Sequence, residues 1–140
     1  MDRQDVDIAN RRQPEEDLRE PENRYRLLFE ANPVPMWVYD RQTLSFLAVN
    51  DAALERYGYT REEFLSMSIL EIRPSEDIPL LLGDLKNLGS GSSVGQWHHR
   101  AKSGEVFFVE VASRELKFAG VQARMVVAKD VTERRQSEKL

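Results

Sequence analysis

The feature that most constrains the fold is a set of three strand patterns in the last third of the chain. Residues 94–101, 106–116 and 122–129 are rich in aromatic and β-branched side chains, and apolar and polar positions alternate through much of them. Short turns at residues 102–104 and 119–120, each with a glycine, separate these segments. Because turns of this length join antiparallel strands, we expect three consecutive antiparallel strands in one sheet.

A second pair of strands is predicted earlier in the chain, at residues 36–40 and 44–49, joined by a short turn. Between the two groups of strands, capping residues and apolar spacing indicate several short helices. Their expected starts are Asn50, Thr60 and Ser68, and the longest helix is expected over residues 76–88. This order predicts an α+β domain in which helices cluster on one side of a five-stranded antiparallel sheet.

The two ends of the chain are richer in charged residues than its middle. We interpret residues 1–23 as a linker with an N-terminal helical extension, and residues 24–131 as one folded domain. Asp130 is a good N-cap, so residues 132–140 are expected to start an output helix. No stop signal follows, which indicates that this helix continues in a longer protein.

Composition excludes several classes of function. The chain has 140 residues, enough for one domain, and a formal net charge of −4 without a long basic stripe, so nucleic-acid binding is not expected. The absence of cysteine excludes disulfides, thiolate metal sites and cysteine nucleophiles. No apolar run approaches the ~18 residues that span a bilayer. We therefore expect a cytoplasmic domain without membrane contact of its own, whatever anchor the parent protein has elsewhere.

Sequence patterns of catalysis and metal binding are missing. There is no phosphate-binding glycine loop, no nucleophile elbow and no metalloprotease histidine pair. The carboxylates at helix starts are of the kind that cap helices. His98 and His99 are neighbours on a predicted strand and point to opposite faces, so they cannot share one metal ion. We expect no catalytic residue and no metal ligand.

Five short motifs, in this order along the chain, resemble the PAS domain family. They occupy residues 25–33, 47–53, 57–64, 100–111 and 130–134. The third reads Tyr-Gly-Tyr-Thr-Arg-Glu-Glu-Phe, and the last reads Asp-Val-Thr-Glu-Arg at the exit from the final strand. The resemblance covers roughly residues 24–135. It implies the PAS fold, with a five-stranded antiparallel sheet, short helices on one face and flanking N- and C-terminal helices.

The resemblance implies a sensor or signal-relay module of a multidomain signalling protein, and we expect a bacterial sensor histidine kinase. The exit motif of the family couples the sheet to the output domain of the same chain, so the expected relay residues are Asp130, Thr132 and Arg134. Two alternatives stay open. One is a ligand-free interaction and dimerisation module, and the other is the PAS domain of a cyclic-dinucleotide regulator.

Dimerisation is expected because flanking helices of this family commonly pair with a second copy. A second helical stretch is predicted at about residues 22–31, and its apolar residues at positions i, i+3 and i+4 form one face. The expected homodimer interface consists of Tyr25, Leu28 and Phe29.

Cofactor expectations follow from the same resemblance. The light-sensing branch needs a cysteine for its flavin adduct, so that photochemistry is excluded. Haem-binding members usually carry their histidine on the long middle helix, and residues 76–88 contain none, so haem is not expected. A non-covalent flavin stacked on Trp37 or Trp97 stays open, with ordinary core packing of both indoles as the alternative.

A small-molecule pocket would lie between the sheet and the helical middle, and would be mostly apolar. The pattern leaves open whether Met36 and Val38 or Trp37 and Tyr39 face inward. Ordinary hydrophobic core is the alternative for every candidate. The candidate lining residues are Met36, Trp37, Leu54, Phe64, Leu85, Trp97, Val109 and Met125.

Overall fold

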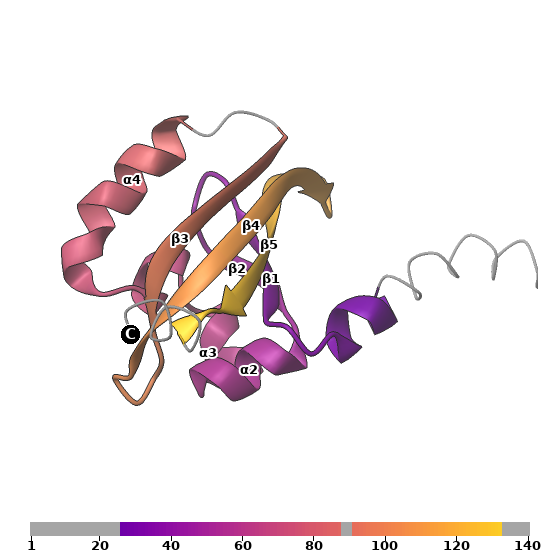
Figure 1. Ribbon diagram of the computed structural model, residues 1–140. Coiled ribbons are helices and arrows are strands. Elements are labelled where there is room, and N and C mark those ends of the chain that lie inside the picture. The colour runs from indigo at the N-terminus through magenta and orange to yellow at the C-terminus, as the bar shows by residue number, and fades with distance from the viewer. Residues whose placement is uncertain (1–25, 88–90, 133–140) are drawn as a thin grey trace, which may run out of the picture.

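A five-stranded antiparallel sheet forms the centre of the domain (Figure 1). The computed structural model describes residues 26–87 and 91–132. The strand order is β2-β1-β5-β4-β3, so the first and last strands pair in the middle of the sheet. The strands are β1 Met36–Asp40, β2 Phe46–Val49, β3 Ser92–Arg100, β4 Val106–Phe118 and β5 Val121–Asp130. The predicted number of strands, their succession along the chain and their antiparallel pairing are confirmed.

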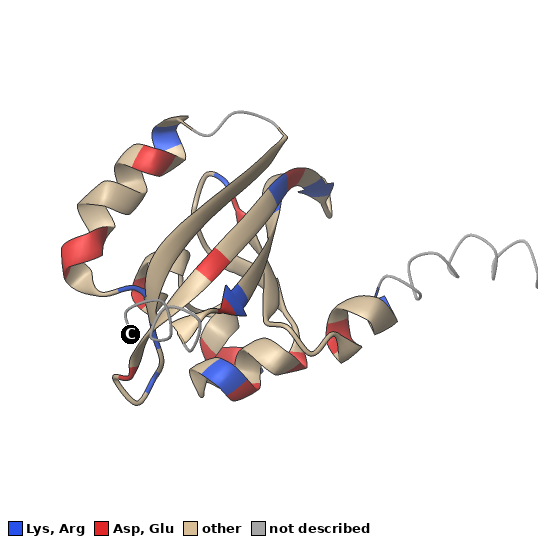
Figure 2. Ribbon diagram, in the orientation of Figure 1, with Lys and Arg blue, Asp and Glu red and all other residues tan. Residues whose placement is uncertain are grey.

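Helices occupy the chain between β2 and β3, as the sequence predicts. They are α2 Asp51–Tyr57, α3 Arg61–Leu65, the 3₁₀ helices η1 Ile69–Ile72 and η2 Ser75–Asp77, and α4 Ile78–Asn87. Residues 26–31 are also helical and lead towards β1. Figure 1 shows α4 running alongside the β3 edge, while α2 and α3 lie close together at the bottom of the view, below the sheet. Figure 2, in the same orientation, shows both acidic and basic residues on α2 and on α4. The expectations for the N-terminal extension, the output helix, Tyr25 and Arg134 lie outside the described residues.

Local capping explains where the short helices begin and end. The Asn50 side chain accepts a hydrogen bond from the Ala53 N–H, and Gly58 ends α2 with φ 82°, which favours glycine. Thr60 and Glu63 form a reciprocal capping box at the start of α3. Asn50 does more than cap, because its side-chain nitrogen donates to the carbonyl oxygens of Phe29 and Val34. It therefore ties the first helix and the following loop to α2.

Strand register decides which side chains face the helices. Trp37 lies opposite Val126, whereas Val38 lies opposite Met125. Trp37 and Val126 belong to the buried core cluster, so the Trp37 face of β1 packs against the helices. Met36 and Met125 lie on the other face of the sheet, which corrects the expectation that they line an inner pocket.

An aromatic cluster fills the space between sheet and helices. Trp37 packs edge-to-face against Phe46 and Tyr57, with ring centroids 5.8 and 5.6 Å apart. Phe64 contacts both of these partners, and Phe107 packs on Tyr57. All five side chains are buried. This cluster packs the helices onto the inner face of the sheet.

Candidate functional site

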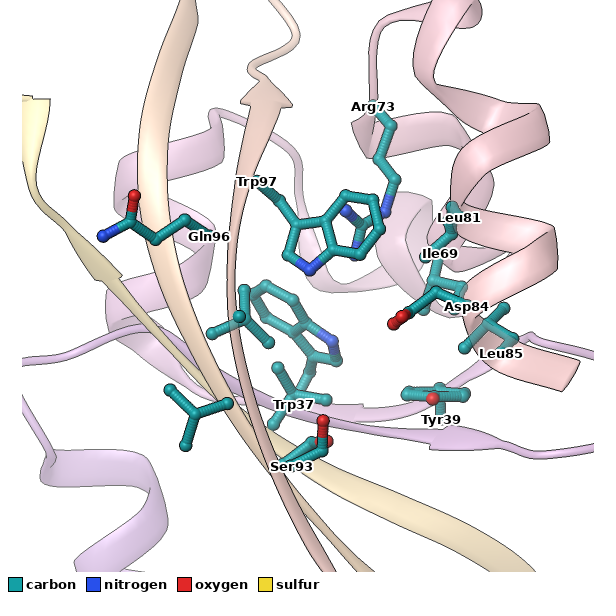
Figure 3. Close-up of a pocket in the computed structure, with 15 residues that line it drawn as sticks. Trp37, Tyr39, Ile69, Arg73, Leu81, Asp84, Leu85, Ser93, Gln96 and Trp97 are labelled. Atoms are coloured by element: carbon teal, nitrogen blue, oxygen red, sulfur yellow. The ribbon is translucent and has the colours of Figure 1, made fainter. Parts of the chain in front are cut away.

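A cavity of about 150 Å³ lies between the inner face of the sheet and α4 (Figure 3). We call it the sheet–helix pocket. Figure 3 shows the Trp97 indole on one side, Trp37 and Tyr39 on another, and α4 side chains closing the remaining side. It is lined by Trp37, Tyr39, Ile69, Arg73, Leu81, Asp84, Leu85, residues 93–97, Val111, Ser113 and Val126.

Three of the eight predicted lining residues meet in this pocket, namely Trp37, Leu85 and Trp97. Phe64 and Val109 are fully buried in the core, and Leu54 packs against that core. None of these three lines the pocket. The alternative of ordinary hydrophobic packing therefore describes their positions.

Arg73 is the unexpected member of the pocket. Its side chain is buried, with 5% exposure, and its Cζ lies 4.9 Å from the centroid of the Trp97 ring. The Nε and Nη1 atoms are buried and have no hydrogen-bond partner among the described residues. Burial of a charge without a hydrogen-bond partner is costly, so this guanidinium stands out among the polar groups of the pocket, which also include Asp84 and Ser113.

Burial lowers the pKa of Arg73 to about 10, and Tyr57, Tyr39, Asp77 and Asp84 oppose this shift in that order. The guanidinium is therefore still protonated at neutral pH. Within the described part of the chain, no carboxylate forms an ion pair with it. Asp77 lies 3.6 Å from His98 instead, and Asp84 sits at the pocket edge on α4.

His99 is a second buried polar side chain, and it lies in the aromatic cluster. Its Nδ1 is 2.5 Å from the Tyr57 hydroxyl, while its Nε2 has no partner among the described residues. Burial, followed by the charges of Arg73 and His98, holds the pKa of His99 well below its ordinary value. Burial also raises the pKa of Tyr57. Both groups are therefore neutral at physiological pH.

The two histidines point to opposite faces, as predicted. His98 packs on the Phe108 ring on one face, while His99 is enclosed on the other. Among the described residues, no group of three or more histidine, cysteine or acidic side chains could hold a metal ion. No helix of residues 26–87 and 91–132 is long and apolar enough to cross a membrane.

The end of β5 forms the second feature of interest, which we call the exit junction: Arg56, Glu105, Phe108, Asp130 and Thr132. The Thr132 N–H donates to Asp130 Oδ1 at 2.9 Å, which is the predicted cap. The Phe108 N–H donates to Thr132 Oγ1 at 3.1 Å. The chain leaving the sheet is therefore fastened to β4 by a side chain as well as by backbone.

Arg56 joins the exit junction to α2 and to the turn between β3 and β4. Its Nη2 donates to Asp130 Oδ2 at 2.8 Å, and its Nη1 donates to Glu105 Oε1 at 3.1 Å. The guanidinium also covers the Phe107 ring at 3.6 Å. Partial burial opposes the shift, but hydrogen bonds from Thr132 and Arg56 hold the pKa of Asp130 below its ordinary value.

The pocket and the exit junction share strands. Val126 of β5 lines the pocket, and Asp130 ends the same strand four residues later, about 13 Å away along an extended chain. Val111 of β4 also lines the pocket, three residues from Phe108 of the junction. The pocket and the exit junction are therefore joined by two continuous strands, β4 and β5.

Sequence reasoning missed Arg73, Asp84, His99 and Arg56. Arg73 follows a short apolar segment and precedes proline, and nothing in that pattern separates a buried arginine from an exposed one. His99 carried a usable signal, because alternation along β3 puts it on the same face as Trp97. Arg56 lies on α2 far from Asp130 in sequence, so only the fold brings the two together.

The family model described as "PAS domain" matches residues 23–92. The chain belongs to the PAS domain family. The predicted PAS fold is confirmed by solved structures. A PAS domain of an HTR-like protein from Haloarcula marismortui has a TM-score of 0.72 and 23% identity, covering 84% of this chain and 98% of that one.

A further solved PAS structure and one curated relative extend this result. A domain of a sensory box sensor histidine kinase/response regulator from Geobacter sulfurreducens matches with TM-score 0.70 and 25% identity, covering 81% of this chain and 96% of that one. A methyl sulfide methyltransferase-associated sensor from Methanosarcina acetivorans is 30% identical over 86% of this chain. The PAS domain described here spans only 12% of that sensor's length. As a PAS domain, the chain is a sensory module of a signalling protein.

Proposed function

We propose that this PAS domain senses a small molecule in the sheet–helix pocket and relays the state of the pocket through the exit junction to an output domain of the same chain. The observation that carries the proposal is the shared strand, because Val126 lines the pocket and Asp130 closes the junction. Packed strands have discrete arrangements, so occupation of one end can bias the other.

The expected parent is a sensor histidine kinase. The match to a domain of a sensor histidine kinase from Geobacter sulfurreducens supports this expectation. The curated relative is named as a sensor, and a cyclic-dinucleotide regulator remains the alternative parent. The sequence that follows Leu140 in the parent gene decides between them: a phosphorylatable histidine helix with an ATP-binding domain would support the kinase.

The volume of the sheet–helix pocket limits the size of the ligand or cofactor that it can hold. A cavity of about 150 Å³ matches one that holds a single benzene ring. The three fused rings of a flavin exceed that volume, so a single-ring compound fits this arrangement of Trp37 and Trp97 better than a flavin does. We propose a colourless small-molecule ligand.

A thermal-shift screen of the 140-residue chain against small metabolites tests the sensing half of the proposal. Binding to the folded state alone raises the melting temperature in proportion to ligand concentration over Kd. We expect compounds up to about one ring in size to stabilise the domain. Failure of every compound class to stabilise it would favour the ligand-free alternative.

The ligand-free interaction module is the second candidate, and one observation favours it. Leu27 and Leu28, on the helix over residues 26–31, are 68% and 66% exposed. Neighbouring exposed leucines on a helix are typical of a surface that a partner covers. We propose that this helix forms a homodimer interface, which is compatible with sensing in the pocket.

A further inference from the structure

The sheet–helix pocket combines an unpaired cation with flat aromatic walls. The Arg73 guanidinium lines the pocket, and two of its nitrogens are buried without a hydrogen-bond partner among the described residues. Figure 3 shows the Arg73 side chain reaching the space beside the Trp97 indole, with Trp37 and Tyr39 across the cavity. If Arg73 served only to fill space, an apolar side chain would be more stable at this position, because a buried charge without a partner destabilises the fold.

The stacking on Trp97 holds the guanidinium in place. Its Cζ lies 4.9 Å from the Trp97 ring centroid, within the range of a cation–π contact. The charge is therefore positioned before any ligand arrives, which reduces the ordering cost of binding. Arginine is also the side chain whose planar donors best match a carboxylate.

A glycine leaves room for the ligand's body. Gly95 lies on the inner face of β3, two residues before Trp97, and it lines the pocket. A Cβ atom at this position would lie 3.2 Å from Trp97 Nε1. The space beside the indole therefore depends on the missing side chain, and a methyl group there would narrow the pocket.

We infer that the sheet–helix pocket binds a small organic monocarboxylate, with its carboxylate at Arg73 and a flat apolar body of about one ring between Trp37, Tyr39 and Trp97. The inference rests on the proposed sensing function and names its ligand class. Asp84 lines the same pocket and would repel a second carboxylate, so the site selects monocarboxylates over dicarboxylates.

Benzoate and its neutral isostere benzamide provide the direct test in the 140-residue chain, by titration calorimetry and thermal shift. The two compounds have nearly the same shape, so their difference reports the charge. We expect benzoate to bind at least about tenfold more tightly than benzamide. Phthalate, a dicarboxylate of similar width, is expected to bind at least about tenfold more weakly than benzoate.

Variants assign the effect to the pocket. Arg73→Gln should reduce benzoate affinity at least about tenfold and leave benzamide affinity unchanged. Arg100→Gln is the matched control, because Arg100 is exposed on β3 and its loss changes net charge equally. Gly95→Ala should weaken benzoate and benzamide alike, because it acts through space rather than charge.

Two results would overturn the inference: benzamide binding as tightly as benzoate, or Arg73→Gln keeping full benzoate affinity. If Arg73→Gln fails to fold, the comparison of benzoate with benzamide on the unchanged protein decides alone. A third result is that neutral compounds bind, that benzoate does not, and that Gly95→Ala weakens the binding of the neutral compounds. This result would refute the ligand class but leave the sensing function standing. Binding of no compound at all would refute both.

Discussion

At the residue scale, two buried polar side chains separate this domain from a simple hydrophobic core. Arg73 and His99 are 5% and 0% exposed, and each has a nitrogen without a partner among the described residues. A fold that needed only packing would gain stability from apolar side chains at both positions. Their retention indicates that the inner face is built for more than packing. Both should leave measurable traces in the stability of the domain.

The first prediction concerns His99 and pH. Its pKa is lowered in the folded state, so below its ordinary value of 6.5 the unfolded state binds a proton that the folded state does not. The free energy of unfolding should therefore fall as pH drops below 6.5, by up to about 1.4 kcal/mol per pH unit. The charges that act on His99 are those of Arg73 and His98.

Urea unfolding at several values between about pH 7 and pH 5 measures this slope. His99→Asn keeps an acceptor for the Tyr57 hydroxyl but cannot titrate, so the slope should disappear. His98→Asn changes the neighbouring histidine on the other face and should keep the slope. An unchanged slope in His99→Asn would contradict the assignment of His99 as the neutral buried group.

At the element scale, the exit junction is held by two separable interactions. The Asp130 side chain caps the Thr132 N–H through one oxygen and pairs with Arg56 through the other. Asp130→Asn retains a capping oxygen while it removes the charge, and Asp130→Ala removes both. This pair of variants distinguishes a helix cap from a link between β5 and α2.

We predict that Asp130→Asn costs about 0.2–1 kcal/mol of unfolding free energy, the range of a partly exposed ion pair. Asp130→Ala should cost about 1 kcal/mol more, because the cap is lost as well. Amide exchange at Thr132 should accelerate in Asp130→Ala and stay near the original rate in Asp130→Asn. Equal exchange rates in the two variants would show that the cap does not hold the chain at this point.

Elements were far easier to predict from the sequence than the site. Alternation and turn glycines located β3, β4 and β5, and Asn50 and Thr60 located the starts of α2 and α3, because these signals act between near neighbours. The pocket depends on long-range pairing. Met36 and Met125 were misplaced because the inward face of β1 is decided by its register with β5.

At the scale of the whole molecule, the helix over residues 26–31 presents apolar surface that no other described residue covers. Leu27 and Leu28 are mostly exposed, whereas Phe29 is half-buried against the domain. Of the predicted interface residues that the structure describes, Leu28 is exposed and Phe29 is partly buried in its own domain. The homodimer remains a prediction.

Light scattering tests the dimer. The combined substitution Leu27→Glu and Leu28→Glu should convert a dimer of about twice the chain mass to a monomer without loss of folded structure, because it places charge on the apolar surface. Leu80→Glu is the matched control, since Leu80 is 70% exposed on α4. A dimer that survives the double substitution would place the interface elsewhere.

We propose direct coupling between the sheet–helix pocket and the exit junction. Amide hydrogen exchange of the 140-residue chain, with and without saturating benzoate, tests it most directly. We predict that the Val131 and Thr132 amides change their exchange rates by about threefold or more when the pocket is filled. Those amides bond to Phe108 and Asp130 in the junction. The contradicting result is that saturating benzoate slows amide exchange around Val126 but leaves the exchange rates of Val131 and Thr132 unchanged. That result would show that the pocket and the junction are not coupled.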